Sequence, residues 1–261
     1  MKKIILLAVL STLFSFGPFA QEAAPGFETD RPNRTEASTW VARGYLQLET
    51  GYQYEKKRQS GTEQRSWLYP QALLRMGLLK SAELRLEATY RQEDQRMAEQ
   101  PEEQEKGLST VRVGTKVNVV APKGAVPEIS VLAMAELPLG HGSFKPRHLA
   151  PDLKLLFTND LSKKVKLQYN TGFRREKEEN TMLDQFQYSA SLSWKISEKL
   201  SVFDEFFGDK VPGHHAQNYL DGGVQYLLLP SLQIDALVGT DLSAHAAEVF
   251  VGGGLSVRLP K

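Results

Sequence analysis

Apolar and polar side chains alternate along most of the chain after residue 43. Leu46, Leu48 and Thr50 share one face of an extended segment, and Gln47 and Glu49 lie on the other. The same period of two returns near residues 82–92, 108–120, 164–174 and 184–196. Alternation over about ten residues is typical of β-strands that place one face against lipid and the other against a polar interior.

Twelve segments of this kind predict an all-β chain, at residues 44–56, 66–78, 82–92, 108–120, 127–139, 150–159, 164–174, 184–196, 199–208, 217–228, 231–241 and 247–259. The ninth is the least regular, because Phe203 and Phe207 share a face with Glu205. Ten extended residues tilted by about 40° rise roughly 25 Å, which is the height of the apolar band of an outer-membrane barrel.

The links between these segments alternate in length. The odd-numbered links are long and polar, at residues 57–65, 93–107, 140–149, 175–183, 209–216 and 242–246, whereas the even-numbered links are tight. A barrel inserted from one side has short periplasmic turns and longer outer loops. We therefore expect residues 44–261 to form a transmembrane antiparallel up-and-down β-barrel of about 12 strands in the cell outer membrane.

The interior of such a barrel would be charged, because lipid does not accept charge. The polar faces assign the following residues to the lumen: Glu49, Arg75, Glu83, Arg85, Glu87, Arg112, Lys116, Glu136, Lys166, Arg174, Asp235 and Arg258. Charges in such a place must be paired or hydrated. They therefore form a salt-bridge lattice that rigidifies the wall, or line a narrow polar pathway, or do both.

The N-terminus resembles a secretory signal peptide over residues 1–20. Lys2 and Lys3 precede an apolar run over residues 4–16, and cleavage is expected after Ala20. The alternative is an N-terminal membrane anchor, but the run is shorter than the ~20 residues that a spanning helix needs.

Residues 21–43 would emerge at the periplasmic mouth of the barrel. They form either a flexible leader or a segment docked in the lumen, with Phe27 and Trp40 anchoring its ends. Charges of opposite sign alternate around Pro32 and make a possible plug of Asp30, Arg31, Arg34 and Glu36. Such charges could pair with an oppositely charged wall.

Overall charge and composition exclude several classes of function. Lys and Arg number 32 against 31 Asp and Glu, so the chain lacks the basic excess of a nucleic-acid-binding protein. Cysteine is absent, which excludes disulfides, thiolate zinc sites and cysteine nucleophiles. We expect no cofactor and no metal site.

Motifs for enzymatic chemistry are scarce. The sequence has no phosphate-binding glycine loop, no HExxH helix and no G-x-S-x-G turn. His141, Gly142 and Ser143 in the third outer link suggest a lipid hydrolase, because a serine nucleophile needs a nearby base. No third residue to orient the imidazole is evident, so we expect a non-enzyme.

Short strings along the chain also carry a family resemblance. They include TDRPNRTE at 29–36, GYLQLETG at 44–51, LLRMGL at 73–78, ELRL at 83–86, YNTG at 169–172 and DGG at 221–223. Together they resemble the outer-membrane "transporter" family labelled putative meta-pathway of phenol degradation. Asn33 departs from the acidic residue expected after the Arg-Pro pair, and Ala37-Ser38 stands where Ser is expected. The resemblance implies a Gram-negative outer-membrane barrel with a poorly defined transport role.

These observations favour a barrel that passively transports small solutes through a narrow charged lumen. Its expected partners are outer-membrane lipid, the barrel assembly machinery, which would read the last strand at 247–259, and an unidentified small solute. A structural or adhesive barrel without transport is the alternative, and an outer-membrane lipid hydrolase is a more distant one.

Overall fold

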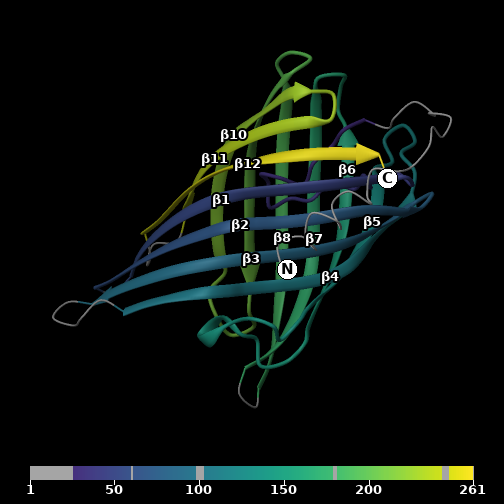
Figure 1. Ribbon diagram of the computed structural model, residues 1–261. Helices are drawn as coiled ribbons and strands as arrows, with labels where there is room; N and C mark the ends of the chain where they lie inside the picture. The colour runs from purple at the N-terminus through teal and green to yellow at the C-terminus, as the bar shows by residue number, and fades with distance from the viewer. Residues whose placement is uncertain (1–25, 60, 98–102, 179–180, 243–246, 261) are drawn as a thin grey trace, which may run out of the picture.

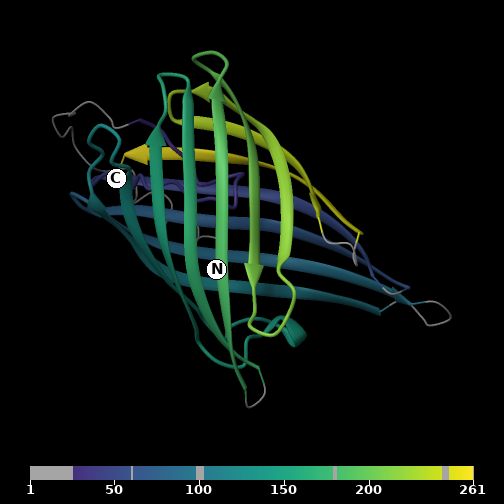
Figure 2. The same ribbon diagram turned by 180° about the vertical axis from the view of Figure 1, so that it is seen from behind.

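A computed structural model describes residues 26–59, 61–97, 103–178, 181–242 and 247–260. This part of the chain forms a closed barrel of twelve antiparallel strands (Figures 1 and 2). The predicted signal peptide at residues 1–20 lies outside the described residues. Within the described residues, no helix is long and apolar enough to cross a membrane.

The strands follow one another around the barrel in chain order. They are β1 (Tyr45–Gln59), β2 (Thr62–Leu79), β3 (Ala82–Met97), β4 (Glu103–Val120), β5 (Glu128–Glu136), β6 (Ala150–Asp160), β7 (Val165–Glu178), β8 (Thr181–Lys195), β9 (Leu200–Lys210), β10 (Gln217–Leu229), β11 (Leu232–Asp241) and β12 (Ala247–Pro260). Strand β12 closes the barrel by pairing with β1, with Pro260 opposite Tyr45. Closure leaves no strand edge unpaired. A sheet in lipid requires this, because unpaired backbone groups have no water to bind there.

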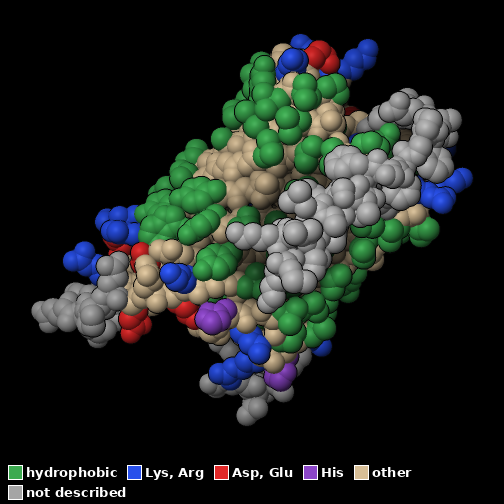
Figure 3. Space-filling model, in the orientation of Figure 1, with side chains coloured by type: hydrophobic (Ala, Val, Ile, Leu, Met, Phe, Trp, Pro, Cys, Tyr) green, Lys and Arg blue, Asp and Glu red, His purple; other side chains and the backbone are tan. Residues whose placement is uncertain are grey.

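Side-chain burial is inverted relative to a soluble protein. Leu86 and Val238 on the outer face are 45% and 57% exposed, whereas Glu49 and Arg75 on the inner face are 0% and 1% exposed. Hydrophobic side chains cover much of the outer surface in Figure 3. This arrangement satisfies the charges inside and leaves apolar groups for lipid, so the protein is a transmembrane barrel of the outer-membrane type.

Aromatic side chains gather on the outer face of β1–β3. Tyr54 contacts Trp67 with ring centroids 5.5 Å apart, and Tyr69 lies between Tyr52 and Tyr90 at 6.2 and 6.1 Å. Aromatic girdles mark the membrane–water interfaces of such barrels. Strands β1 to β4 continue beyond this level, and Figure 1 shows their ends projecting from the barrel.

The predicted outer links at 57–65, 93–107 and 175–183 were wrong in extent. Strand β1 runs to Gln59 and β2 begins at Thr62, while β3 reaches Met97, β7 reaches Glu178 and β8 begins at Thr181. Beyond the lipid both faces of a hairpin can be polar, so the alternation fades although strand pairing continues. Residues 137–149 form a longer connection, which includes the 3₁₀ turn η2 (Gly142–Phe144).

Candidate functional site

Residues 26–43 lie inside the barrel, and we call them the lumen segment. This segment has no strand partner, yet every strand of the wall contacts it. The contacting side chains, one for each strand from β1 to β12, are Glu49, Arg75, Arg85, Lys116, Ser130, Lys154, Asn170, Ser191, Glu205, Gln225, Gln233 and Arg258. The segment therefore crosses the lumen and is held from all sides.

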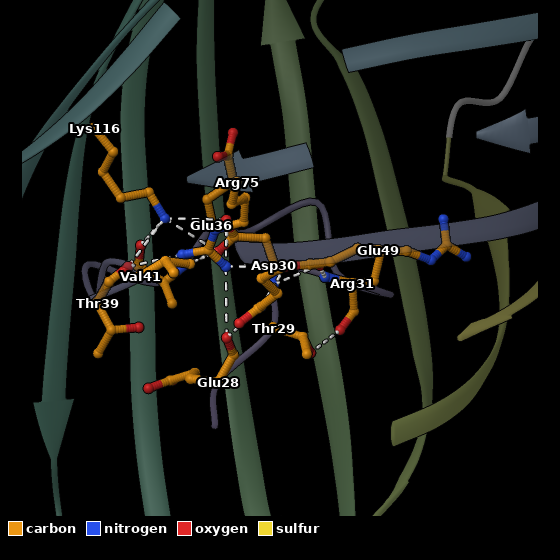
Figure 4. A network of polar contacts seen from close by, with 12 residues as sticks. Glu28, Thr29, Asp30, Arg31, Glu36, Thr39, Val41, Glu49, Arg75 and Lys116 are labelled. Carbon is orange, nitrogen blue, oxygen red and sulfur yellow. Dashed lines mark hydrogen bonds and ion pairs between the residues drawn. The ribbon is translucent and has the colours of Figure 1, made fainter. Parts of the chain in front are cut away.

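Asp30 is the central charge of this arrangement. Its Oδ2 lies 2.6 Å from Arg85 NH1, 3.0 Å from Lys116 Nζ and 3.2 Å from Arg75 NH1. Asp30 is 5% exposed, and Lys116 is fully buried. Figure 4 shows the lysine and Arg75 converging on the lumen segment from different strands. Three cations around one carboxylate require further acids nearby to balance them.

Glu83 and Glu49 supply that balance through Arg75. Arg75 Nε and NH2 donate to the two oxygens of Glu83 at 2.9 and 3.0 Å, and NH1 donates to Glu49 Oε1 at 3.0 Å. A two-pronged guanidinium–carboxylate contact is among the strongest polar interactions in proteins. The ion pairs connect β1, β2, β3 and β4 to the lumen segment in one network.

The same wall charges satisfy the backbone of the lumen segment. Glu49 Oε2 accepts the N–H groups of Asp30 and Arg31 at 3.0 and 2.9 Å, and Glu205 accepts those of Arg34, at 2.8 Å, and Thr35. A buried N–H or C=O group without a partner is costly, and an irregular segment cannot supply partners to itself. The charged wall therefore stabilises an irregular backbone conformation in the lumen.

Cationic and amide side chains of the wall donate hydrogen bonds to the carbonyl groups of the lumen segment. Lys116 Nζ donates to Ala37 O at 2.8 Å, Arg75 NH2 to Thr39 O at 3.1 Å, and Asn170 Nδ2 to Glu36 O at 3.0 Å. The wall thus supplies acceptors for the N–H groups and donors for the C=O groups of the lumen segment.

Both ends of the lumen segment have an aromatic contact. Arg258 lies 5.2 Å from the ring centroid of Phe27 and donates to Gly26 O at 3.1 Å. At the other end Trp40 Nε1 donates to Lys80 O at 2.9 Å, in the turn between β2 and β3. The segment is therefore fixed at both ends as well as along its length.

Two carboxylates of the lumen segment have lowered pKa values. Burial raises the pKa of Asp30, but the charges of Arg75, Lys116 and Arg85 outweigh burial and hold it well below its usual range. Burial also raises the pKa of Glu36, and Arg85 and Lys154 outweigh it to give a pKa of about 2. Both groups therefore carry their negative charge at neutral pH, which the ion-pair network requires.

A cavity of about 700 Å³ lies between the lumen segment and the end of the barrel at which β1 connects to β2. We call this cavity the vestibule. Asp30, Arg31, Asn33, Arg34 and Glu36 form its floor, and polar side chains of the strands form most of its wall. The chain end at Pro260 pairs with the start of β1, at the opposite end of the barrel. By the usual orientation of such barrels, the vestibule is on the extracellular side.

Part of the vestibule wall is aromatic. Phe207 and Tyr219 stack with ring centroids 5.0 Å apart, and Phe250 lies 6.3 and 6.4 Å from them. These three side chains line the cavity from β9, β10 and β12. Arg34 of the lumen segment lies over the Phe207 ring, 5.8 Å from its centroid.

The structure places the lumen residues expected from the sequence on the inner side, in three groups. Glu49, Arg85, Glu87, Arg112 and Arg174 line the vestibule. Arg75, Glu83 and Lys116 belong to the ion-pair network around Asp30. The others pair individually: Glu136 with Arg174 at 2.6 Å, Asp235 with Arg31 at 3.6 Å, Lys166 with Glu28 at 2.7 Å, and Arg258 with the backbone of Gly26. That they line a conducting path stays a prediction.

Sequence reasoning missed two features of the lumen. Neutral residues such as Asn170, Ser130 and Ser191 contact the lumen segment. They lie on the polar face of their strands, and this position in the alternation could have identified them. The aromatic group was missed because Phe207 was noted only as an irregularity of the ninth segment, and Tyr219 and Phe250 were not considered. The unusual apolar residues beside Glu205 on β9 were the available signal for an inward apolar group.

Ser143, the residue behind the hydrolase alternative, contacts the carboxylate of Glu105. Its hydroxyl donates to Glu105, and Glu105 also accepts the Ser143 N–H at 2.7 Å. Together these bonds join the η2 turn to β4. They account for Ser143 as a structural residue of the outer loop.

Comparison with known proteins places the chain in a family. A family model described as "Putative MetA-pathway of phenol degradation" matches residues 29–259. The chain belongs to this family. The match begins at Thr29, so it includes most of the lumen segment as well as the barrel. No curated protein matches the sequence.

Several solved barrels share the fold. The COG4313 outer membrane channel from Pseudomonas putida F1 has a TM-score of 0.66 at 10% identity, over 89% of this chain and 100% of that one. The beta domain of the Bordetella autotransporter BrkA has a TM-score of 0.58 at 10% identity, covering 82% and 99%. The NanC porin has a TM-score of 0.52 at 8% identity, covering 82% and 100%. At these identities the likeness concerns the fold.

Proposed function

We propose that the protein passively transports small solutes across the outer membrane, and that the lumen segment is the constriction of its pathway. Solutes would enter the vestibule from outside and pass between the lumen segment and the wall. The family and the outer membrane channel from Pseudomonas putida F1 support a channel. The protein has no covalent chemistry in this proposal.

One observation carries the proposal: an open polar vestibule ends on a segment that every strand holds by hydrogen bonds or ion pairs. A barrel that served only as a scaffold would not need an interior of matched charges around a central chain. Buried ion pairs contribute little net stability compared with apolar packing, so their presence favours a role for a polar lumen.

Planar bilayers test this function directly. We expect the purified full-length barrel to give small, uniform current steps, because the lumen segment leaves only narrow routes through the lumen. Replacing residues 27–38 by a Gly/Ser sequence of equal length should enlarge the steps several-fold, because the segment then loses its side-chain contacts with the wall.

Absence of current steps in both proteins would contradict the channel and favour a structural or adhesive barrel. Equal steps in both proteins would retain the channel and contradict the constriction. A shift in gel mobility on heating, which reports an intact barrel, is the control for folding in each case.

A further inference from the structure

We propose that the vestibule contains a subsite for small organic cations, formed by Phe207, Tyr219 and Phe250 together with the carboxylates of Asp209 and Asp221. The inference rests on the proposed function for its relevance to transport, but it concerns binding and can be tested separately. It names the class of solute that the vestibule would retain: compact cations such as guanidinium or alkylammonium groups.

The three aromatic side chains line the cavity from fixed positions. Phe207 and Tyr219 are opposite one another in the β9–β10 ladder and stack at 10° between ring planes. Phe250 packs over Gly239, where an added Cβ would lie 2.2 Å from its Cζ. Stacked, supported rings beside a cavity form a surface that attracts cations through the negative charge of the ring face.

Carboxylates lie on both sides of the stacked pair. Asp209 is two residues beyond Phe207 on β9, and Asp221 is two residues beyond Tyr219 on β10, so the strands place one acid toward each end of the ring pair. Both acids line the vestibule. Aromatic faces between acids are a common composition of sites for organic cations.

Asp221 is a buried acid whose neighbour across the β9–β10 ladder is a second acid, Glu205. Asp221 is 5% exposed and lines the vestibule, yet its Oδ1 has no hydrogen-bond partner among the described residues. Among the described residues, the Asp209 carboxylate accepts a side-chain hydrogen bond only from the neutral amide of Gln185, at 2.8 Å. A buried carboxylate oxygen without a donor is costly, and a bound cation would relieve that cost.

The opposite wall differs in its charge balance. Arg112 lies between Glu87, at 3.2 Å, and Asp152, and Lys154 pairs with Glu36 at 3.0 Å. By contrast, no Lys or Arg side chain of the described residues forms an ion pair with Asp209 or Asp221. The acids beside the aromatic rings therefore lack a salt bridge to any described residue, and the cation whose charge acts on Asp221 is Arg34 of the lumen segment.

Arg34 shows how a cation sits against this surface. Its guanidinium lies over the Phe207 ring and makes no hydrogen bond or ion pair with any residue in the described ranges. The lumen segment is held by the Arg34 backbone N–H, which donates to Glu205. The side chain can therefore leave the ring without breaking a hydrogen bond or ion pair to the described residues, and an incoming cation would compete with it for the same face.

Titration calorimetry of the detergent-solubilised full chain tests the subsite. The probe is methylguanidinium chloride, with N-methylurea as its neutral analogue and sodium chloride at equal ionic strength as the inorganic cation. We expect saturable methylguanidinium binding that the other two solutes do not reproduce. Asp221→Asn should weaken it about tenfold and Phe207→Leu about threefold, the range of a charge contact and a cation–π contact.

Arg34→Gln has the opposite expectation, because it removes the competing guanidinium. Methylguanidinium should then bind about three times more tightly. Glu87→Gln, which neutralises a carboxylate on the opposite wall of the vestibule, is the matched control and should weaken binding far less than Asp221→Asn. Phe186→Leu, on the lipid-facing surface, is the control for loss of an aromatic ring.

The subsite would be overturned if N-methylurea bound as well as methylguanidinium, or if Glu87→Gln weakened binding as much as Asp221→Asn. The transport proposal fails separately. Calorimetric binding without current steps in bilayers would contradict transport and retain the subsite, whereas current steps without binding would contradict the subsite alone.

Discussion

At the scale of single residues, Asp30 is the side chain on which the lumen network depends. It contacts Arg85, Lys116 and Arg75, and it also accepts the Ala37 N–H at 3.0 Å. Asp30→Asn would leave buried cations without their acid, which typically costs about 3–5 kcal/mol. We expect the variant barrel to lose its heat-resistant gel mobility at a clearly lower temperature than the unmodified protein.

Asp184 provides the control for this substitution. It pairs with Arg175 at 2.6 Å at the exposed end of the β7–β8 hairpin, where water screens the interaction. Asp184→Asn should therefore hardly change the transition temperature. A similar loss in both variants would mean that the burial of Asp30 does not govern its contribution.

The lowered pKa values of Asp30 and Glu36 predict how the lumen segment responds to acid. A carboxyl group with a lowered pKa in the folded protein stabilises it fully above its ordinary pKa of about 4, and this contribution is lost as the pH falls toward the folded value. For Glu36 the folded pKa is about 2. The part of the single-channel conductance that depends on Glu36, measured as the difference between the unmodified protein and Glu36→Gln, should thus be constant between about pH 8 and pH 5 and change only in stronger acid.

A difference between the two proteins that already changed between about pH 7 and pH 5 would contradict this prediction, because Glu36 should still be charged there. The Glu36→Gln variant supplies the comparison. It removes the contacts of Glu36 with Arg85 and Lys154 at every pH, so its conductance should change less on acidification.

Inward residues could be predicted from the sequence, but their partners could not. The alternation of apolar and polar positions alone places Arg75, Glu83 and Lys116 on the polar face of their strands. The contact of Lys116 with Asp30 joins residues 86 positions apart and depends on barrel closure and on the path of the lumen segment. No local sequence pattern encodes barrel closure or the path of the lumen segment. The sequence alone therefore did not decide between a rigid salt-bridge lattice and a polar pathway.

At the scale of elements, the lumen segment and the hairpins differ in how well the sequence reveals them. The tight turns and the strand cores follow from alternation, because lipid enforces an apolar outer face. The ends of β1, β2, β3 and β4 extend beyond the lipid and lose that signal. For the lumen segment, alternating charges around Pro32 suggested docking, but only the wall contacts distinguish docking from a flexible leader.

Deletion of residues 27–38 would remove most of the lumen segment. It removes the backbone groups that Glu49, Glu205 and Lys116 contact, and so it leaves several inward charges without partners. We expect larger conductance steps and a lower melting temperature, since charge-assisted hydrogen bonds are lost. Circular dichroism of the purified variant would follow the melting of the strands.

A properly folded deletion variant with unchanged conductance and unchanged melting would mean that the segment does not occupy the lumen in the membrane. Deletion of residues 212–215, in the connection between β9 and β10, is a control of the opposite kind. It shortens an outer loop without touching the lumen segment, so neither property should change greatly.

At the scale of the whole molecule, charge balance governs selectivity. The chain carries a net charge of +1, and positive and negative side chains of the lumen are mostly paired with one another. A pore with a balanced lining has a weak preference between cations and anions. The acids beside the aromatic rings should make that preference slightly cationic.

Arg112 is the position at which this balance can be shifted with least damage. It lines the vestibule between Glu87 and Asp152, whereas Arg75 does not line it and belongs to the buried network. Arg112→Gln would leave two acids facing the solute path without their cation. The reversal potential in a salt gradient should then move toward the potassium equilibrium potential. Lys195→Gln, which removes an exposed partner of Glu198 at a turn, should leave it unchanged, and equal shifts in both variants would contradict a pathway past Arg112.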